Sequence, residues 1–406
     1  MSSDSTIGIT LREAYPQALA RVLAAVRRLD VAEDALHDAV ERALVRWPID
    51  GMPESVEGWL VTVALNRRRD ELRHAQRVER HADTVALALG PVDLASVAGA
   101  HVWHDDLLRL LVTACDPALS TADAAALALA TTLGMTTREI ARAFLVEERT
   151  MEQRLVRARR RLRDEGREYV VPTEPVAAER LEPVMAALYL LFTEGHWSTE
   201  GAPAVRVELC VLALDLARSL ARIAPDDLEL DALVATMLLH EARRATRVSP
   251  DGVPIPLPEQ DRARWDRTRI DEAAALLRRR EPPRAMRGPR RWEAEIALAH
   301  ASARTAEDTD WATIAASYTE LERLRPSPHV RVNRSFALAR AHGPREGLRL
   351  LDDVPDDVPY ASFVRAVLLA EAGELDHARE AFTRARSLTK NVHEQREIDQ
   401  RLASLR

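Results

Sequence analysis

The chain has 406 residues, which is enough for two or three domains with separate hydrophobic cores. Its formal net charge of −7 excludes a protein that binds polyanions over its whole surface, so any nucleic-acid surface must be local. Alanine and leucine run through nearly every segment, aromatic residues make up only 4%, and alternating runs of Val, Ile and Thr are few. This composition predicts an all-α protein.

Two cysteines, Cys115 and Cys210, are too few for a disulfide framework or a zinc site, and they suit a reducing cytoplasm. The N-terminal sequence MSSDSTIGITLREAYPQALARVL shows no basic leader followed by an apolar core. Nowhere do about 18 uncharged apolar residues run together. We therefore expect a soluble, cytoplasmic protein with no membrane segment.

Segments that contain Gly, Pro and Ser interrupt the helical pattern and divide the chain into three zones. The segment LGPVDLASVAGA predicts a linker over residues 78–102, between a first module of residues 1–77 and a second of residues 103–170. Three prolines in VVPTEPVAAERLEP then break any continuous helix, so we expect a third zone over residues 171–406.

The first module contains an acidic helix, AEDALHDAVERAL, followed by the basic stretch NRRRDELRHAQR. Asp34, His37, Asp38 and Glu41 recur at helical spacing on one face of the acidic helix, beside the apolar side chains of Leu36 and Val40. Such a stripe suits a complementary basic partner. An ordinary solvated helix face is the alternative.

The second module contains two amphipathic patterns joined by a short polar interruption, EER. Thr136 followed by Glu139 is a capping box, which predicts that a helix begins there. A second helix is expected from Arg149 to Arg163. Its apolar face is formed by Met151, Leu155, Ala158 and Leu162. This arrangement predicts a helix-turn-helix.

The second of these helices is strongly basic. It holds seven arginines against a single acid, Glu152, although the whole chain is acidic. Glu152, Gln153, Val156 and Arg157 project from its early turns, where a recognition helix meets base edges, and the later arginines would face phosphates. The alternative is a solvated face or an interdomain ion-pair surface.

The third zone contains a repeat. Its anchors are Tyr318, Leu351 and Phe382, which lie 33 and 31 residues apart. A compact residue precedes each anchor by four positions, namely Ile314, Gly347 and Ala378. The spacing is close to the roughly 34-residue period of tetratricopeptide (TPR) helix pairs, which stack and leave a concave surface. Chance periodicity in Ala- and Leu-rich helices is the alternative.

These residues resemble a known family. TTREIARAFLVEERTMEQRLVRARRRLR resembles the promoter-binding sigma-four domain of extracytoplasmic-function (ECF) bacterial sigma factors, and DVAEDALHDAVERALVRWP with GWLVTVALNRRRDELRHAQR resembles their sigma-two domain. LYLLFTEGHWS, LLHEARRATR, EQDRARWDR, EDTDW and PSPHVRVNRSFALA resemble the TPR-like C-terminal extension of one ECF subgroup. The resemblance covers nearly the whole chain in the family's order.

The resemblance implies that the acidic helix binds RNA polymerase core. Its counterpart docks on the clamp helices of the beta-prime subunit, and the sigma-four domain meets the beta flap. The implied core-polymerase residues are Asp34, Leu36, His37, Asp38, Val40 and Glu41. The family usually has glutamine at the position of His37.

The resemblance also implies two contacts with promoter DNA. The loop DGMPES would capture an unstacked minus-ten base, and Trp59 would pack the sigma-two core. The opened strand would be held by Asn66, Arg67, Arg68, Arg69 and Arg73. Minus-thirty-five recognition would fall to Arg149, Glu152, Gln153, Arg154, Val156, Arg157 and Arg160.

Two positions of the second module depart from the family pattern. Leu145 occupies a turn position where many helix-turn-helix units have glycine, which suggests a reshaped turn. Glu152 stands where basic residues are common, and a carboxylate can accept a hydrogen bond from cytosine, which would change the sequence that is read.

The sequence leaves two other functions open. An enzyme in the third zone would use Glu194 and His196 in FTEGHW, or His240 and Glu241 in LLHEARR, but the latter lacks the second histidine of a HExxH zinc helix. A helix-turn-helix regulator with a ligand-sensing solenoid would have no need of the acidic first module. We expect a sigma factor with no catalytic residue, no metal and no cofactor. Its third zone is expected to regulate in cis, by binding the sigma domains, polymerase or a small ligand.

Overall fold

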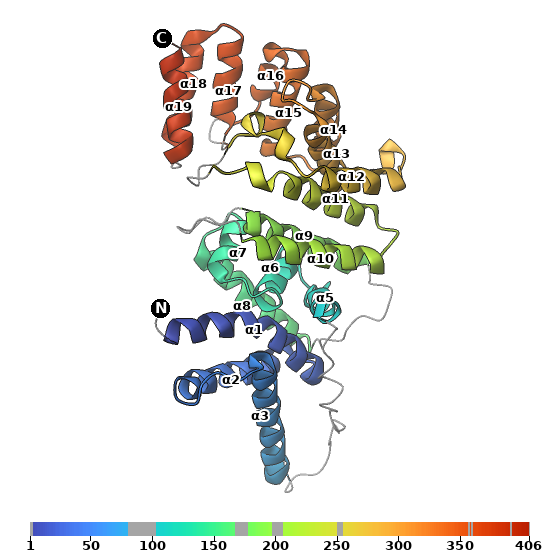
Figure 1. The fold of residues 1–406 in the computed structure, drawn as a ribbon, viewed down its shortest axis with the longest axis vertical. Coiled ribbons are helices and arrows are strands. Elements are labelled where there is room, and N and C mark those ends of the chain that lie inside the picture. The colour runs from blue at the N-terminus through green and yellow to red at the C-terminus, as the bar shows by residue number, and fades with distance from the viewer. Residues whose placement is uncertain are drawn as a thin grey trace. The chain divides into compact units, whose positions relative to one another are not determined.

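The computed structural model describes residues 3–79, 103–166, 178–196, 206–249, 255–355, 358, 360–389 and 392–405. In these segments the chain forms α-helices and short 3-10 helices and no β-strand, which confirms the all-α prediction (Figure 1). The chain divides into two compact units, Met1–Pro225 and Asp226–Arg406.

The first unit begins with three helices that pack on one another: α1 (Ser3–Val26), α2 (Leu29–Asp50) and α3 (Val56–Glu79). Leucines at helical spacing bury their side chains in the shared core, as Leu19, Leu36 and Leu60 show with 0% exposure. The rings of Trp47 and Trp59 meet edge to face at a centroid distance of 5.2 Å and fix the end of α2 against the start of α3.

The remaining helices of the first unit form a second layer of packing. They are α5 (Trp103–Ala114), α6 (Thr121–Thr131), α7 (Thr137–Ala143), α8 (Glu148–Asp164), α9 (Ala178–His196) and α10 (Val207–Ile223). Residues 124–129 of α6 are all 0–1% exposed, so this helix is covered on every side. Its neighbours are α5, α7, α8 and, most extensively, α9.

Helix α9 also closes the end of α5. The Arg180 guanidinium donates through Nη1 to the backbone oxygens of Val112, Thr113 and Cys115 at 3.1, 3.2 and 3.2 Å, and its Nη2 lies 3.5 Å from Asp116 Oδ2. A cation at these carbonyls opposes the negative end of the helix dipole. The first compact unit runs to Pro225, and the division expected at residue 170 stays a prediction.

The second unit begins with α11 (Leu228–Ala242) and α12 (Arg267–Arg279), which pack together, and α13 (Pro289–Ser302) packs against α11. Between them lie the 3-10 turns η1 (Arg244–Thr246), η2 (Leu257–Glu259), η3 (Arg262–Arg264) and η4 (Arg284–Met286). The Glu229 carboxylate of α11 accepts hydrogen bonds from the backbone N–H groups of Arg290 and Arg291, at 2.9 and 3.2 Å, and so caps the start of α13.

Each following helix packs on the one before it. The series is α14 (Trp311–Leu324), α15 (Pro328–His342), α16 (Pro344–Leu351), α17 (Ala361–Glu371), α18 (Leu375–Leu388) and α19 (Val392–Ser404), and Figure 1 shows α15 to α19 side by side in chain order. This is the arrangement of a helical repeat, in which a unit contacts only its neighbours.

The predicted repeat coincides with these helix pairs. Each anchor and its compact partner lie on the second helix of a pair, in α14, α16 and α18. Ile314 and Ala378 are fully buried, and so are the anchors Leu351 and Phe382. At Gly347 a Cβ would lie 2.5 Å from the Ser335 carbonyl oxygen, so only glycine permits the close approach of α15 and α16. Among the described helices, none is long and apolar enough to cross a lipid bilayer.

Candidate nucleic-acid interface

The first helix of the predicted helix-turn-helix begins with the expected capping box. Thr136 Oγ1 accepts the Glu139 backbone N–H at 3.2 Å, and Glu139 Oε2 accepts the Thr136 backbone N–H at 2.7 Å. Two backbone donors that a helix start leaves without partners are thereby satisfied. Ile140 and Ala141 turn inward and are buried, so α7 is fixed on the core by one face.

The turn after α7 corrects one expectation. The sequence predicts a reshaped turn at Leu145, but the residue adopts the left-handed conformation, with φ of 54°, that glycine usually supplies. The Leu145 N–H bonds to the Arg142 oxygen at 3.0 Å and the Val146 N–H to the Ala141 oxygen at 2.9 Å, which is the Schellman pattern. The turn keeps its ordinary geometry and leucine bears the strain, with its side chain 88% exposed.

Helix α8 follows with one buried and one exposed face. The buried face is the predicted one: Met151, Leu155, Ala158 and Leu162 are each 0–4% exposed. The exposed face contains most of the residues assigned to minus-thirty-five recognition: Arg149, Glu152, Gln153, Val156, Arg157 and Arg160. A surface of this kind is open to the major groove, which admits one α-helix.

Arg154 lies differently from its neighbours on α8. Its Nε donates to Asp123 Oδ1 on α6 at 3.0 Å, and its guanidinium lies 5.5 Å from the centre of the Phe144 ring. The side chain therefore ties α8 to α6 and the turn and is only partly exposed. This position suits a residue that holds the recognition helix better than one that reads a base.

Farther along α8 the arginines have acidic partners. Arg160 and Arg161 pair with Asp164 and Glu165 one turn later, at 3.3 and 3.1 Å, on the exposed surface. Arg159 reaches the acidic helix of the first module, where its Nη2 lies 3.1 Å from Glu33 Oε1 on α2. The two exposed pairs, of Arg160 and Arg161, are worth little energetically, so phosphates can replace their carboxylates at small cost.

The acidic stripe of α2 is partly as predicted from the sequence. Asp34, His37 and Glu41 are exposed and Asp38 and Val40 are partly buried. Leu36 is 0% exposed and belongs to the core, so we remove it from the candidate binding face. The Asp38 carboxylate is paired with Arg67 of α3, a residue that the sequence assigned to the opened DNA strand.

The candidate minus-ten elements lie at the start of α3. The preceding loop is exposed at Gly51, Met52, Glu54 and Ser55, and Ser55 Oγ accepts the Gly58 N–H at 3.1 Å, which starts the helix. Asn66 is exposed and Arg67 partly so. The side chains of Arg68, Arg69 and Arg73 lie outside the described part of the chain, as does most of the predicted linker, residues 80–102.

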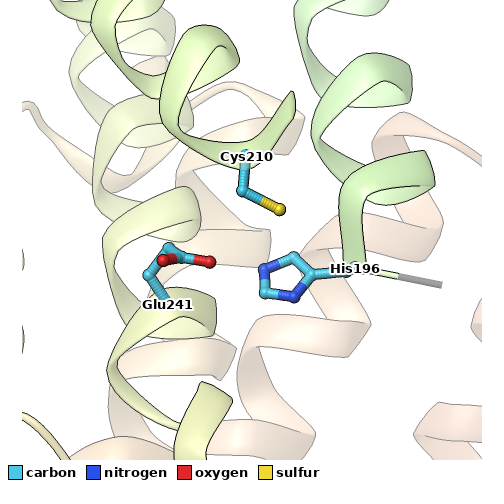
Figure 2. A group of neighbouring side chains, drawn as sticks. All are labelled: His196, Cys210 and Glu241. Carbon is cyan, nitrogen blue, oxygen red and sulfur yellow. The ribbon is translucent and has the colours of Figure 1, made fainter. Parts of the chain in front are cut away.

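The groups considered for an enzyme have structural contacts. Glu194 lies 3.4 Å from Arg142, and the His196 ring packs edge to face on Phe192 at 4.4 Å. Figure 2 shows the His196 ring of α9 and the Cys210 thiol of α10 turned toward each other. The thiol donates a hydrogen bond to the Phe192 backbone oxygen at 3.6 Å. Glu241, also labelled in Figure 2, belongs to the second unit, where it pairs with Arg244 and Arg269 at 2.7 and 2.9 Å.

A feature that sequence reasoning missed is the contact of α9 and α10 with the helix-turn-helix. Arg206, the residue before α10, lies 2.7 Å from Glu139 Oε1, and Glu194 of α9 pairs with Arg142 of α7. The partners are 67 and 52 residues apart in the sequence. No local pattern marks such pairs, because periodicity reports only contacts within one helix.

Comparison with known proteins agrees with the geometry of α5 to α8. Residues 110–162 match the family profile described as "Sigma-70, region 4", and residues 180–281 match a family of unknown function, DUF6596. A protein of Rhizobium meliloti (strain 1021) that is described as uncharacterized is 37% identical over 413 residues, covering 97% of this chain and 94% of that protein.

Two solved structures are similar at low identity. The TPR domain of P58(IPK) is 16% identical and covers 97% of this chain and 98% of its own, with a TM-score of 0.27. Yeast Tom70 is 13% identical and covers 99% of this chain and 84% of its own, with a TM-score of 0.34. The repeat architecture of this chain is defined by the sequential packing of α13 to α19.

Proposed function

The chain belongs to the same family as the Rhizobium meliloti protein and has a sigma-70 region 4 domain over residues 110–162, and from this we propose that it is an ECF-type sigma factor. It would bind RNA polymerase core, place it at a promoter and start transcription. One observation supports the proposal most strongly. Within the residues that match region 4, the capped helix α7 is followed by α8, which has an exposed polar and basic face.

Region 4 would read the minus-thirty-five element with α8. Glu152, Gln153 and Arg157 are exposed on its early turns, where side chains reach base edges, and Arg149 and Arg160 flank them at positions suited to phosphates. Arg154 would act as a positioning residue through Asp123. No covalent chemistry is required, and no side chain is assigned to catalysis, a metal or a cofactor.

The first module would bind polymerase and open the DNA. The exposed carboxylates Asp34 and Glu41 fit a basic docking surface, which the resemblance identifies as the beta-prime clamp helices. The exposed loop before α3 and Asn66 would receive the minus-ten strand. The ion pair between Arg159 of α8 and Glu33 of α2 would have to break when polymerase binds α2 or DNA binds α8 at this point.

The extension after region 4 would regulate in cis. Its first two helices, α9 and α10, are part of the region 4 unit, and the repeat beyond Pro225 supplies a further surface. This arrangement supports control of the activity or the stability of region 4 without a separate anti-sigma protein.

A core-binding measurement with a charge reversal tests the proposal. We expect the purified full chain to bind core polymerase, and Asp34→Arg to weaken binding at least about tenfold, roughly 1.4 kcal/mol. Asp376→Arg, at a 94% exposed acid on α18, is the matched control and should bind normally. Equal binding by both variants would reject the α2 face, and no binding by the unaltered chain would reject the sigma-factor role.

A further inference from the structure

Three short motifs of the second unit converge at the C-terminal end of α13. They are LLHEARRATR (238–247), EQDRARWDR (259–267) and EDTDW (307–311). Trp265 Nε1 donates to Thr246 Oγ1 at 2.9 Å, and the Asp266 N–H to the Ala242 oxygen at 2.9 Å, which joins the first two motifs. Trp311 of the third lies 5.2 Å from the ring of His300, in the last turn of α13.

The guanidinium of Arg262 lies where these three motifs meet, at the C-terminal end of α13. The residue is 6% exposed, its guanidinium lies 4.7 Å from the centre of the Trp265 ring, and its Nη1 donates to the oxygens of His300 and Ala303 at 2.6 and 3.2 Å. Its buried Nε has no hydrogen-bond partner among the residues that the structure describes. Both carbonyls accept hydrogen bonds from Nη1, and in the described part of the chain no carboxylate forms an ion pair with Arg262.

Arg243, which ends α11 next to η1, is the second guanidinium. It is partly buried, and within the described residues its one polar side-chain contact is with His240 Nδ1, at 3.3 Å. Burial, followed by the nearby Arg247 and Arg262, lowers the pKa of Arg243 to about 10. Burial, Arg243 and Arg262 likewise lower the pKa of His300 to about 4, so the imidazole is neutral at pH 7.

Among the described residues, no acid forms an ion pair with Arg243 or Arg262. Glu307 and Asp308 are within electrostatic reach of Arg262, but both are exposed. Glu241 is already shared by Arg244 and Arg269. Two guanidinium groups that are partly out of water, lie within electrostatic reach of each other and have no ion-paired carboxylate among the described residues are costly, because each has lost hydration and is repelled by the other. Such an arrangement becomes favourable when an anion binds.

We propose that Arg243, Arg262 and His300 form a binding site for an oxyanion, the phosphate or carboxylate group of a small molecule. The planar guanidinium fork donates two parallel N–H groups, which matches the geometry of both anions. The neutral imidazole of His300 adds a hydrogen-bonding nitrogen without further repulsion. The site lies wholly in the second unit and does not depend on the proposed role in transcription.

The test uses the full chain with inorganic phosphate and with succinate as probes. Each is compared with sodium chloride at equal ionic strength and pH 7.5, by thermal unfolding and by titration calorimetry. We expect at least one anion to raise the midpoint of unfolding of the second unit. Arg243→Gln should raise the Kd for that anion at least about tenfold. Arg349→Gln is the control, since Arg349 is 72% exposed on α16, and should bind normally.

A measurement in chloride alone separates a ligand-binding arginine from a structural one. Because no carboxylate pairs with Arg243 in the described structure, Arg243→Gln should leave the midpoint unchanged or raise it when no oxyanion is present. A clear loss of stability in chloride would assign Arg243 to the fold and overturn the proposal. Equal anion binding by the variant, or no effect of either anion on the unaltered chain, would also overturn it.

Discussion

Arg206 Nη1 lies 2.7 Å from Glu139 Oε1, while the other oxygen of the same carboxylate closes the capping box of α7 at the Thr136 N–H. One side chain thus links the start of the helix-turn-helix to the segment that follows region 4. Helix α9 reinforces the link by covering α6 and by donating from Arg180 to the end of α5. The extension is built into the fold of region 4.

A pair of truncations tests this dependence. Ending the chain after Pro172 removes α9, whose buried Val184, Leu188 and Leu191 each contribute about 1.5–3 kcal/mol by leaving water. We expect that fragment to aggregate or to melt well below the fragment that ends after Pro225, as followed by circular dichroism and size-exclusion chromatography. Equal melting of the two fragments would show that region 4 folds without α9 and α10.

A substitution in the turn of the helix-turn-helix tests the strain at Leu145. Glycine pays no steric penalty at positive φ, whereas other residues lose roughly 1–2 kcal/mol there. Since the Leu145 side chain is 88% exposed, little packing is lost on its removal. Leu145→Gly should therefore unfold at a higher urea concentration than Leu145→Ala, the reverse of their order inside a helix. The opposite order would mean that the turn is not left-handed.

Two arginines of α8 should behave differently toward DNA. Arg160 is exposed and suited to a phosphate, so Arg160→Gln should lower the slope of log affinity against log salt by about 1 on duplex DNA. Arg154 is held by Asp123, so Arg154→Gln should leave the slope unchanged and lower the melting temperature instead. Fluorescence anisotropy at several salt concentrations measures both. A reduced slope for Arg154→Gln alone would place Arg154 on the DNA-binding face.

His300 should make the second unit sensitive to acid. Its pKa is about 4 in the folded chain and 6.5 when exposed, so the unfolded chain takes up a proton between these values and the folded chain does not. The His300 contribution to the free energy of unfolding is therefore fully present above pH 6.5. It falls by about 3 kcal/mol as the pH drops toward 4. Urea unfolding at pH 7 and 4.5 measures this decrease. The free energy of unfolding of His300→Gln should decrease less between the two pH values than that of the unaltered chain. Equal loss would contradict the shifted pKa.

Local features of this molecule were predictable from the sequence. The capping box at Thr136 and the buried face of α8 both depend on side chains within a few turns of one helix. Leu145 has a backbone conformation that leucine rarely adopts, so the residue type predicts the wrong turn geometry at this position.

Long-range features were not predictable in the same way. Arg154 faces inward because Asp123, 31 residues earlier, is brought beside it by the fold. Leu36 occupies the core because α1 and α3 both pack on α2. The approach of Arg243 to Arg262 likewise depends on how η1 meets η3. Helical periodicity contains no information on which distant charge will lie opposite.

Promoter-dependent transcription in a reconstituted system tests the central claim most directly. Purified chain and core polymerase are incubated with fragmented genomic DNA from the source organism, and the transcripts are sequenced with and without the chain. The account predicts new transcripts that share an upstream element, and predicts their loss when Gln153 and Arg157 on the exposed face of α8 are both changed to alanine. Transcripts that are unchanged on adding the chain, while an ordinary sigma factor directs initiation from the same core, would contradict it.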